Sequence, residues 1–199
     1  APSDKNAHPH LSRNKKISVV HNGIIENYIA LKEELQQNGF VFRSETDTET
    51  VAHLIEQSYN GDFFEAVREA VSRLEGSYAL GIINSKNPDE LIAAKHMSPL
   101  IIGVGENENF IASDVTALVS HTKNVIYLED GEIAILTKNS VKVFNQKGEE
   151  IKKQIVAVNW NIEAAEKGGF SHFMLKEIME QPKAVRETIL PRIKDGKIV

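Results

Sequence analysis

A series of short apolar segments between residues 78 and 144 constrains the fold of this chain more than any other feature. The segments are separated by turn-forming residues such as Gly, Pro, Asn and Asp, and they span 78–83, 91–94, 100–104, 109–112, 124–128, 132–137 and 140–144. This pattern predicts successive β-strands joined by short turns, with hairpin turns at 129–131 and 138–139. Because several segments are apolar throughout, we expect their strands to be covered on both faces.

Apolar residues at helical spacing predict three helices ahead of these strands. The three stripes are Tyr28, Leu31 and Leu35, then Val51, Leu54, Ile55 and Tyr59, then Phe64, Val67, Val71 and Leu74. Residues 40–42 are predicted to form a short strand. Helices followed by many strands indicate an α+β chain with stacked sheets and helices outside them.

The bulk composition excludes several classes of protein. The 199 residues are 41% hydrophobic and 26% charged, which is ordinary for a globular chain. A net charge of -5 argues against nucleic acid as the main partner. No segment is apolar and long enough to span a membrane, and no signal peptide opens the chain, so we expect a soluble, cytoplasmic protein. The absence of cysteine excludes a thiol nucleophile within these residues.

The segment from Ile17 to Asn27 combines a strand-like run with the tripeptide His21-Asn22-Gly23. We interpret it as a buried strand that ends in a tight turn, from which a helix begins. One interpretation is an ordinary Asn-Gly turn. The other is an oxyanion hole, because an Asn side-chain amide beside a backbone N–H is a common pair of donors for a developing negative charge.

Two further polar segments allow more than one interpretation. Residues 43–49 either cap the second helix through Ser44, Thr46 or Asp47, or supply one carboxylate that binds an ammonium group. His8 and His10, with His21 further along the chain, resemble part of a metal site. No convincing third ligand lies at close spacing, so a loop with hydrogen-bonded histidines is the favoured interpretation.

The chain after residue 166 is predicted to contain a joint, a helix and a stop signal. Gly168 and Gly169 form the joint, Ser171 is the expected N-cap, and Pro182 is expected to limit the helix.

Six motifs occur in an order that goes beyond composition. They are VHNGIIEN at 20–27, SETDTE at 44–49, GSYA at 76–79, SPL at 98–100 with Gly103, IASD at 111–114 and HFMLKEIMEQP at 172–182. Together they resemble the glutaminase domains of the glucosamine-6-phosphate synthase family, the isomerizing glutamine–fructose-6-phosphate aminotransferases. The resemblance covers nearly the whole chain, and its last motif is the most specific.

The resemblance implies a four-layer α-β-β-α sandwich, the fold of the N-terminal-nucleophile amidotransferases, lacking its first strands. Residues 1–165 would form a partial glutaminase domain. Residues 166–199 would form a helix and a linker toward absent sugar isomerase domains. The family takes the amide nitrogen of glutamine and delivers it as ammonia to fructose 6-phosphate, which yields glutamate and glucosamine 6-phosphate.

The resemblance also implies residue roles. Asn22 and Gly23 would form the oxyanion hole, and Asp47 would hold the α-ammonium group of glutamine, so that Gly23 and Asp47 both contact the substrate. The family's cysteine nucleophile and the arginine that grips the glutamine carboxylate have no counterpart in this chain. We therefore expect the chain alone to be inactive.

The resemblance implies no metal or organic cofactor and no nucleic-acid or membrane partner. Its partners would be glutamine, the sugar isomerase domains and a second subunit in a homodimer. Two alternatives are the glutaminase domain of another amidotransferase, such as phosphoribosyl-pyrophosphate amidotransferase, and a non-catalytic module that binds an amino acid.

Overall fold

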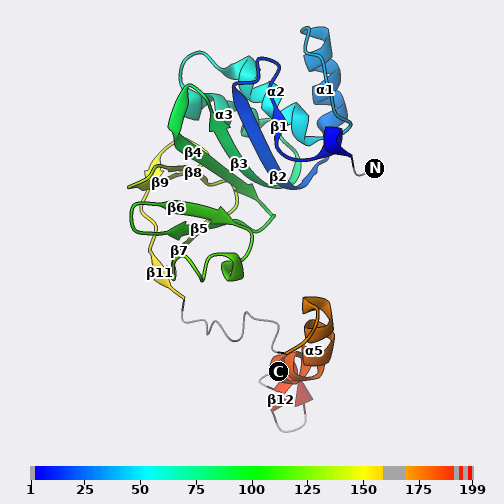
Figure 1. The fold of residues 1–199 in the computed structure, drawn as a ribbon, viewed down its shortest axis with the longest axis vertical. Helices are drawn as coiled ribbons and strands as arrows, with labels where there is room; N and C mark the ends of the chain where they lie inside the picture. Colours follow the sequence, from blue (N-terminus) through cyan, green and yellow to red (C-terminus); the bar gives the residue numbers. More distant parts are fainter. Residues whose placement is uncertain (1–2, 159–168, 191–192, 195–196, 199) are drawn as a thin grey trace. The chain divides into compact units, whose positions relative to one another are not determined.

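A computed structural model of the chain describes residues 3–158, 169–190, 193–194 and 197–198 (Figure 1). The chain divides into two units, Ala1–Val158 and Asn159–Val199. The domain boundary expected at residue 165 falls outside the described residues and stays a prediction.

Two antiparallel sheets form the framework of the first unit, in agreement with the strand pattern of the sequence. The larger sheet has the strand order β1-β2-β3-β4-β8-β9-β10, where the strands are β1 (His10–Leu11), β2 (Ile17–Ile25), β3 (Gly76–Asn84), β4 (Asn87–His96), β8 (Ile133–Leu136), β9 (Val141–Phe144) and β10 (Glu150–Ile151). The smaller sheet has the order β11-β7-β5-β6, with strands β5 (Ile101–Val104), β6 (Asn109–Ala112), β7 (Asn124–Tyr127) and β11 (Val156–Ala157).

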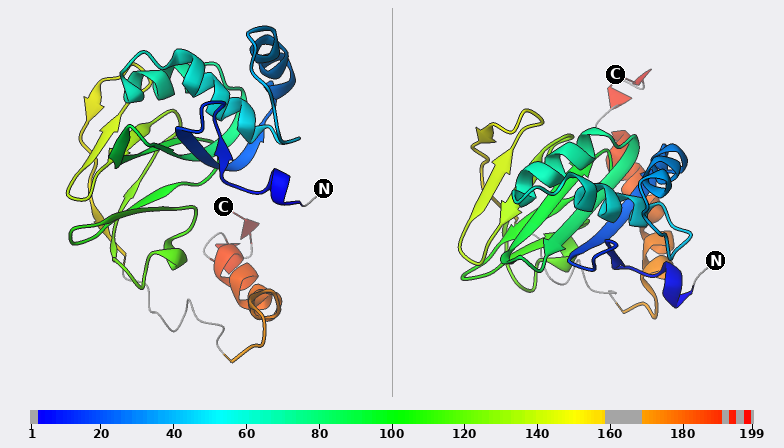
Figure 2. Two further views of the ribbon diagram at one scale, coloured as in Figure 1. Left: turned by 45° about the horizontal axis from the view of Figure 1, so that its top comes forward. Right: turned by 90° about the horizontal axis from the view of Figure 1, so that it is seen from above.

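Helices cover the larger sheet on one face. The helices of this unit are α1 (Tyr28–Gln37), α2 (Thr48–Ser58) and α3 (Phe63–Ser72), and a short 3-10 helix η1 (Asp4–Asn6) precedes β1. Helices α2 and α3 contact strands of the sheet, whereas α1 packs against α2. In both views of Figure 2, α2 and α3 lie over this sheet. The three predicted helices are confirmed, although α3 buries Phe63 fully and Phe64 only in part.

The central strands are packed on both faces, as their continuous apolar sequence predicts. On β3, Leu80 and Ile82 belong to the core under the helices, whereas Ala79 belongs to the core between the sheets. Full burial of a Leu or Ile side chain contributes roughly 1.5–3 kcal/mol. A Cβ at Gly81 would lie 2.6 Å from Ile111 Cδ1, so its glycine permits the two sheets to approach closely.

The outer face of the smaller sheet has its own apolar cluster. The 3-10 helix η2 (Val115–Ala117) and the residues after it contribute Val115, Leu118 and Val119, which pack with Ile101 and Val125. The observed order of layers is therefore helices, larger sheet, smaller sheet and η2. The fold class expected from the sequence, a mixed α and β chain with two stacked sheets, is confirmed.

Two local predictions are wrong for reasons of tertiary packing. Residues 40–42 form no strand, because the rings of Phe40 and Phe42 pack against His53 of α2 and not along a neighbouring strand. The turn at 129–131 connects β7 of the smaller sheet to β8 of the larger sheet, so it is not a hairpin. The turn at 138–139 does join two paired strands, β8 and β9.

The second unit contains helix α5 (Phe173–Ile189) and the paired strands β12 (Ile193–Lys194) and β13 (Lys197–Ile198). The N-cap is His172 and not Ser171, and Pro182 lies inside the helix, so both predictions are wrong. One proline removes one backbone hydrogen bond, and the strong helix formers on both sides of Pro182 continue the helix. Gly168 of the predicted joint lies outside the described residues. Among the described residues, no helix is long and apolar enough to cross a membrane.

Candidate functional site

Strand β2 continues without interruption through Asn22 and Gly23, so the tight turn predicted there is wrong. Asn22 pairs with Ala79 of β3, and Gly23 pairs with Tyr78. Gly23 has φ +129°, and a Cβ there would overlap the carbonyl oxygen of Ser77 and lie 2.9 Å from the Ser98 hydroxyl. A glycine is required here because the two strands lie too close for a Cβ. A tight turn also requires glycine, so the sequence alone does not distinguish the two cases.

The outer edge of β2 is open along its second half. The short strand β1 pairs only with Ser18 and Val19. Peptide groups of alternate residues point to the same edge of a strand. On this edge the Ile17 carbonyl accepts from Ser12 N–H, and the Ile25 N–H donates to Asp47 Oδ2 at 2.7 Å. The alternation therefore directs the N–H of Gly23 toward the same open edge.

Asp47 lies at the N-cap position of α2, but its side chain makes no capping hydrogen bond. The carboxylate accepts the Ile25 N–H instead, and its side chain remains 22% exposed. Asp47, one of three N-cap candidates in the sequence, is therefore the N-cap residue by position, but its side chain does not cap the helix. Gly23 is two residues from Ile25, which corresponds to about 7 Å along a strand. The Asp47 carboxylate therefore lies on this edge of β2, two residues beyond Gly23.

The residue after Asp47 is held by two histidines. The hydroxyl of Thr48 lies 3.2 Å from His8 Nε2 and 3.1 Å from His21 Nδ1. Burial lowers the pKa of His21, although the Asp47 carboxylate, 3.9 Å away, opposes the shift. A neutral imidazole is therefore favoured near pH 7. In the part of the chain that the structure describes, no group of three or more His, Asp and Glu side chains is arranged to hold a metal ion.

Glu49 is a functional candidate that no sequence motif singled out. This buried carboxylate accepts hydrogen bonds from the backbone of Arg43 and from the backbone and hydroxyl of Ser44. Burial alone would raise the pKa of Glu49, but these bonds outweigh burial and lower it. In the sequence Glu49 does not stand out, because an acidic residue in the first turn of a helix is common.

A cavity of about 290 Å³ opens beside Asn22. Its walls come from both sheets and from the loop that carries His8, and they include His8, Val20, His21, Asn22, Ala79, Leu100 and Ile111. Asn22 is exposed, so its side-chain amide is accessible from this space. Of the two predicted oxyanion donors, Asn22 thus lines the cavity, and Gly23 is the next residue of the same strand.

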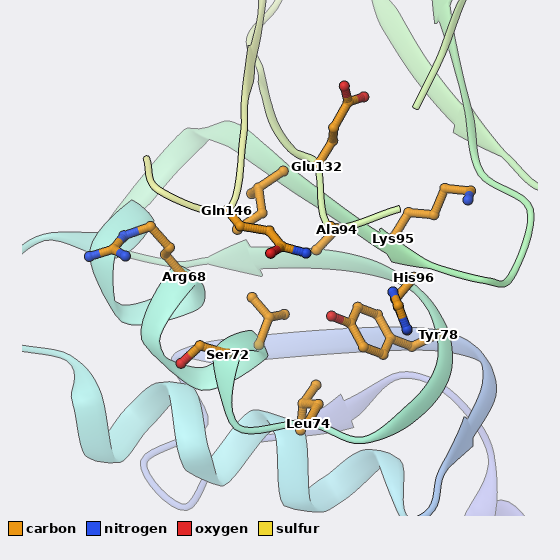
Figure 3. A pocket seen from close by; sticks show the side chains of 12 residues that line it. Arg68, Ser72, Leu74, Tyr78, Ala94, Lys95, His96, Glu132 and Gln146 are labelled. Atoms are coloured by element: carbon orange, nitrogen blue, oxygen red, sulfur yellow. The ribbon is translucent and has the colours of Figure 1, made fainter. Parts of the chain in front are cut away.

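A second cavity, of about 320 Å³, lies near the end of α3 (Figure 3). Tyr78 directs its hydroxyl into this cavity, and His96 and Gln146 also line it. Burial raises the pKa of Tyr78, so its hydroxyl is protonated at neutral pH. None of Asn22, Gly23 and Asp47 lines this cavity, and no sequence motif predicted it.

The fold places the chain in a class of proteins, the N-terminal-nucleophile amidotransferases. A solved structure of glutamine phosphoribosylpyrophosphate amidotransferase from B. subtilis matches with a TM-score of 0.65 and 28% identity, over 75% of this chain and 34% of that chain. A second solved structure, described as the allosteric regulatory enzyme of purine biosynthesis, matches with a TM-score of 0.60 and 28% identity, over 71% and 31% of the two chains.

The chain belongs to the glutamine amidotransferase domain family, whose sequence pattern matches residues 2–120. The isomerizing glutamine–fructose-6-phosphate aminotransferase of Clostridium tetani is 55% identical over 196 residues, which are 98% of this chain and 32% of the relative. The protein of the same name from Caldanaerobacter subterraneus is 54% identical over 199 residues, or 100% of this chain and 33% of the relative. The chain therefore spans about a third of the length of these curated relatives.

Proposed function

We propose that this chain is the glutamine-binding part of an isomerizing glutamine–fructose-6-phosphate aminotransferase. The similarity to proteins of that name reaches 55% identity, against 28% for the phosphoribosylpyrophosphate amidotransferase structure. This difference favours amino-sugar formation over the alternative amidotransferase reaction. Membership in an enzyme family likewise argues against a module that only binds an amino acid.

Three residues carry the proposed chemistry. Asn22 donates its side-chain amide, and Gly23 its N–H, to the oxygen of the glutamine amide as negative charge develops there. Asp47 pairs with the α-ammonium group, and Gly23 also contacts the substrate. The observation that carries this assignment is the 2.7 Å hydrogen bond from the Ile25 N–H to Asp47 Oδ2, because it brings the carboxylate to the edge of the Asn-Gly strand.

The attacking nucleophile is not among these residues, because the chain contains no cysteine. In the proposed reaction a thiol attacks the amide carbon and its proton passes to the amide nitrogen, so that ammonia leaves. Water then hydrolyses the thioester, which releases glutamate and restores the thiol. The chain contributes orientation and electrostatic stabilisation to these steps. These contributions alone form no acyl-enzyme, so we expect no glutaminase activity from the chain by itself.

The test is a glutaminase assay on the chain alone and on the chain joined behind the preceding segment of the C. tetani relative. We expect activity only in the joined protein. There, Asn22→Ala should lower kcat about 100- to 1,000-fold, the range for loss of one oxyanion donor. Asp47→Asn should raise KM for glutamine, because the α-ammonium group loses its counter-charge.

The matched control is Asp89→Asn, which removes one carboxylate from an exposed position of β4. It should leave kcat and KM unchanged. Glutaminase activity in the chain alone would refute the role of an external nucleophile, and unchanged kinetics in both Asn22→Ala and Asp47→Asn would refute the site.

The proposed partner is a sugar isomerase domain in the part of a full-length aminotransferase that this chain does not span. Ammonia must reach fructose 6-phosphate without escaping to water, so a sugar isomerase domain must dock closely, with residues 168–182 as the interface or linker. Replacing Glu177 with Lys should then uncouple glutamine hydrolysis from sugar amination, and unchanged coupling would contradict this interface. A homodimer in the cytoplasm completes the proposal.

A further inference from the structure

The Asp47 carboxylate is in an unusual position for the N-cap of a helix. An N-cap aspartate normally accepts the N–H groups of the first turn of its own helix. Asp47 accepts the N–H of Ile25, a residue of β2, and makes no capping bond in α2. The usual capping preference of aspartate would direct this side chain to the N–H groups of α2. The surrounding tertiary structure must therefore hold the Asp47 backbone where the carboxylate reaches the Ile25 N–H instead.

Glu49 makes the contacts that fix the loop before Asp47. Its Oε2 accepts from Ser44 N at 2.7 Å, from Ser44 Oγ at 2.7 Å and from Arg43 N at 3.0 Å. Its Oε1 accepts from Arg43 N at 2.9 Å. The side chain is buried and points back from the first turn of α2, so it joins the loop to the helix on both sides of Asp47.

The same network continues to the neighbouring strand. The Ser44 hydroxyl lies 3.0 Å from the Thr46 hydroxyl, which in turn lies 3.1 Å from Nε2 of His10 on β1. Ser44 and Thr46 are thus connected to the buried carboxylate of Glu49, whereas the side chain of Glu45 is exposed and pairs with Lys5.

We infer that Glu49 is a positioning residue for Asp47: its buried carboxylate anchors the loop at Arg43 and Ser44 so that Asp47 faces the edge of β2 and not the start of α2. The inference rests on the proposed function for its consequence, which is the correct placement of the group that binds the α-ammonium of glutamine. Glu49 itself contacts no substrate.

The network requires a carboxylate and not an amide. Three donors converge on Oε2 of Glu49, and the Arg43 N–H also approaches Oε1. A carboxylate offers two oxygens and only accepts hydrogen bonds, whereas an amide replaces one oxygen with an NH₂ donor. In Glu49→Gln this NH₂ would face an N–H or O–H donor, so at least one bond to the loop must be lost.

The test follows the Ile25 amide proton by NMR in the ¹⁵N-labelled chain. A hydrogen bond to a carboxylate at 2.7 Å should shift this proton downfield, and Asp47→Asn calibrates the position without that charge. In Glu49→Gln we expect the Ile25 proton to move at least halfway toward the calibrated position, and the Arg43 and Ser44 amides to exchange at least tenfold faster. The control Glu45→Gln should change neither.

Ser44→Ala provides a milder variant in case Glu49→Gln does not fold. It deletes one donor to Glu49 and leaves the carboxylate with its backbone bonds, so a smaller shift of the Ile25 proton in the same direction is expected. The inference is overturned if the Arg43 and Ser44 amides lose protection while the Ile25 proton stays at its wild-type position. It is also overturned if Glu45→Gln moves that proton as far as Glu49→Gln does.

These measurements use no glutamine, so they succeed or fail independently of the proposed function. A second readout connects the two in the joined protein described above: Glu49→Gln should raise KM for glutamine at least tenfold and change kcat less than threefold. Unchanged KM in Glu49→Gln, with raised KM in Asp47→Asn, would contradict the positioning role alone. Unchanged KM in Asp47→Asn would contradict the proposed substrate contact, whatever the NMR result.

Discussion

The two halves of strand β2 share one partner on one side and differ on the other. Both halves pair with β3 along their inner edge. The first half is also paired with β1, at Ser18 and Val19, whereas the second half meets Asp47 at Ile25. Where its neighbouring strand ends, a strand has an unpaired edge. The backbone N–H groups on that edge can then donate hydrogen bonds to a carboxylate or a ligand.

The largest effect on stability should come from adding a side chain at Gly23, in the second half of β2. Gly23→Ala combines φ +129° with overlap of the Ser77 carbonyl, so we expect a loss of about 3–5 kcal/mol in the free energy of unfolding. Gly61→Ala is the matched control, because φ is +118° there and nothing lies within 4 Å of the new Cβ. It should cost about 1–2 kcal/mol. Equal losses by urea denaturation would mean that strain, and not strand approach, requires Gly23.

The next largest effect on stability should distinguish the two faces of β2 after Gly23, which carry Ile25 and Ile24. Ile25→Ala should cost about 2–4 kcal/mol, because Ile25 is fully buried beneath the helices. Ile24→Ala should change stability by less than about 0.5 kcal/mol, since Ile24 is 65% exposed. Similar losses in both variants would show that the alternation of faces breaks down beyond Gly23.

Acid should lower the free energy of unfolding, because three buried histidines lie on β1, β2 and α2. Burial lowers the pKa of His10 on β1, of His21 on β2 and of His53 on α2. The unfolded chain binds protons with a histidine pKa near 6.5, so it takes up more protons than the folded chain below that pH. Stability should therefore fall as the pH drops below about 6.5, by at most about 1.4 kcal/mol per pH unit for each histidine.

Urea denaturation between pH 7.5 and 5 measures this loss, which we expect to total about 1–3 kcal/mol. His53→Leu should make the pH dependence shallower, because it removes one of the three groups. Glu49 adds a further loss at lower pH, because its pKa is lowered in the folded chain and its stabilisation disappears as it is protonated. Stability that stays flat down to pH 5 would contradict the assignment of neutral buried histidines.

The smallest effect on stability should come from the proposed substrate contact. Asp47→Asn keeps an oxygen that accepts the Ile25 N–H, so we expect a change below about 1 kcal/mol in the free energy of unfolding. The same variant should raise KM for glutamine in the joined protein. A stability loss above about 2 kcal/mol would show that the open edge of β2 depends on this carboxylate for folding.

Much of the fold follows from local patterns in the sequence. Apolar spacing predicted α1 through Leu31 and Leu35, and α3 through Val67 and Val71, because one face of each helix is buried in the same core. Continuous apolar runs predicted strands buried on two faces, as Leu80 and Ala79 illustrate.

Local patterns failed where a distant partner determines the backbone. The Asn22-Gly23 pair has the composition of a turn, yet β3 holds it extended. The residues at 129–131 also have turn composition, but only the assignment of β7 and β8 to different sheets shows that they do not form a hairpin. Pro182 signals a helix end, and the helix formers around it continue α5 past that point.

The sequence by itself determined the kinds of elements, the absence of a cysteine nucleophile and the residue types offered at the proposed site, because these depend on composition and on neighbours along the chain. Only the tertiary structure decided that Asp47 faces Ile25, that Gly23 lies against Ser77, and that Glu49 connects the loop to the helix. The first two contacts join residues far apart in the chain, so a short-range pattern does not contain them. Glu49 and Ser44 are near in sequence, but several backbone paths are open to the loop between them, and only the folded structure selects one.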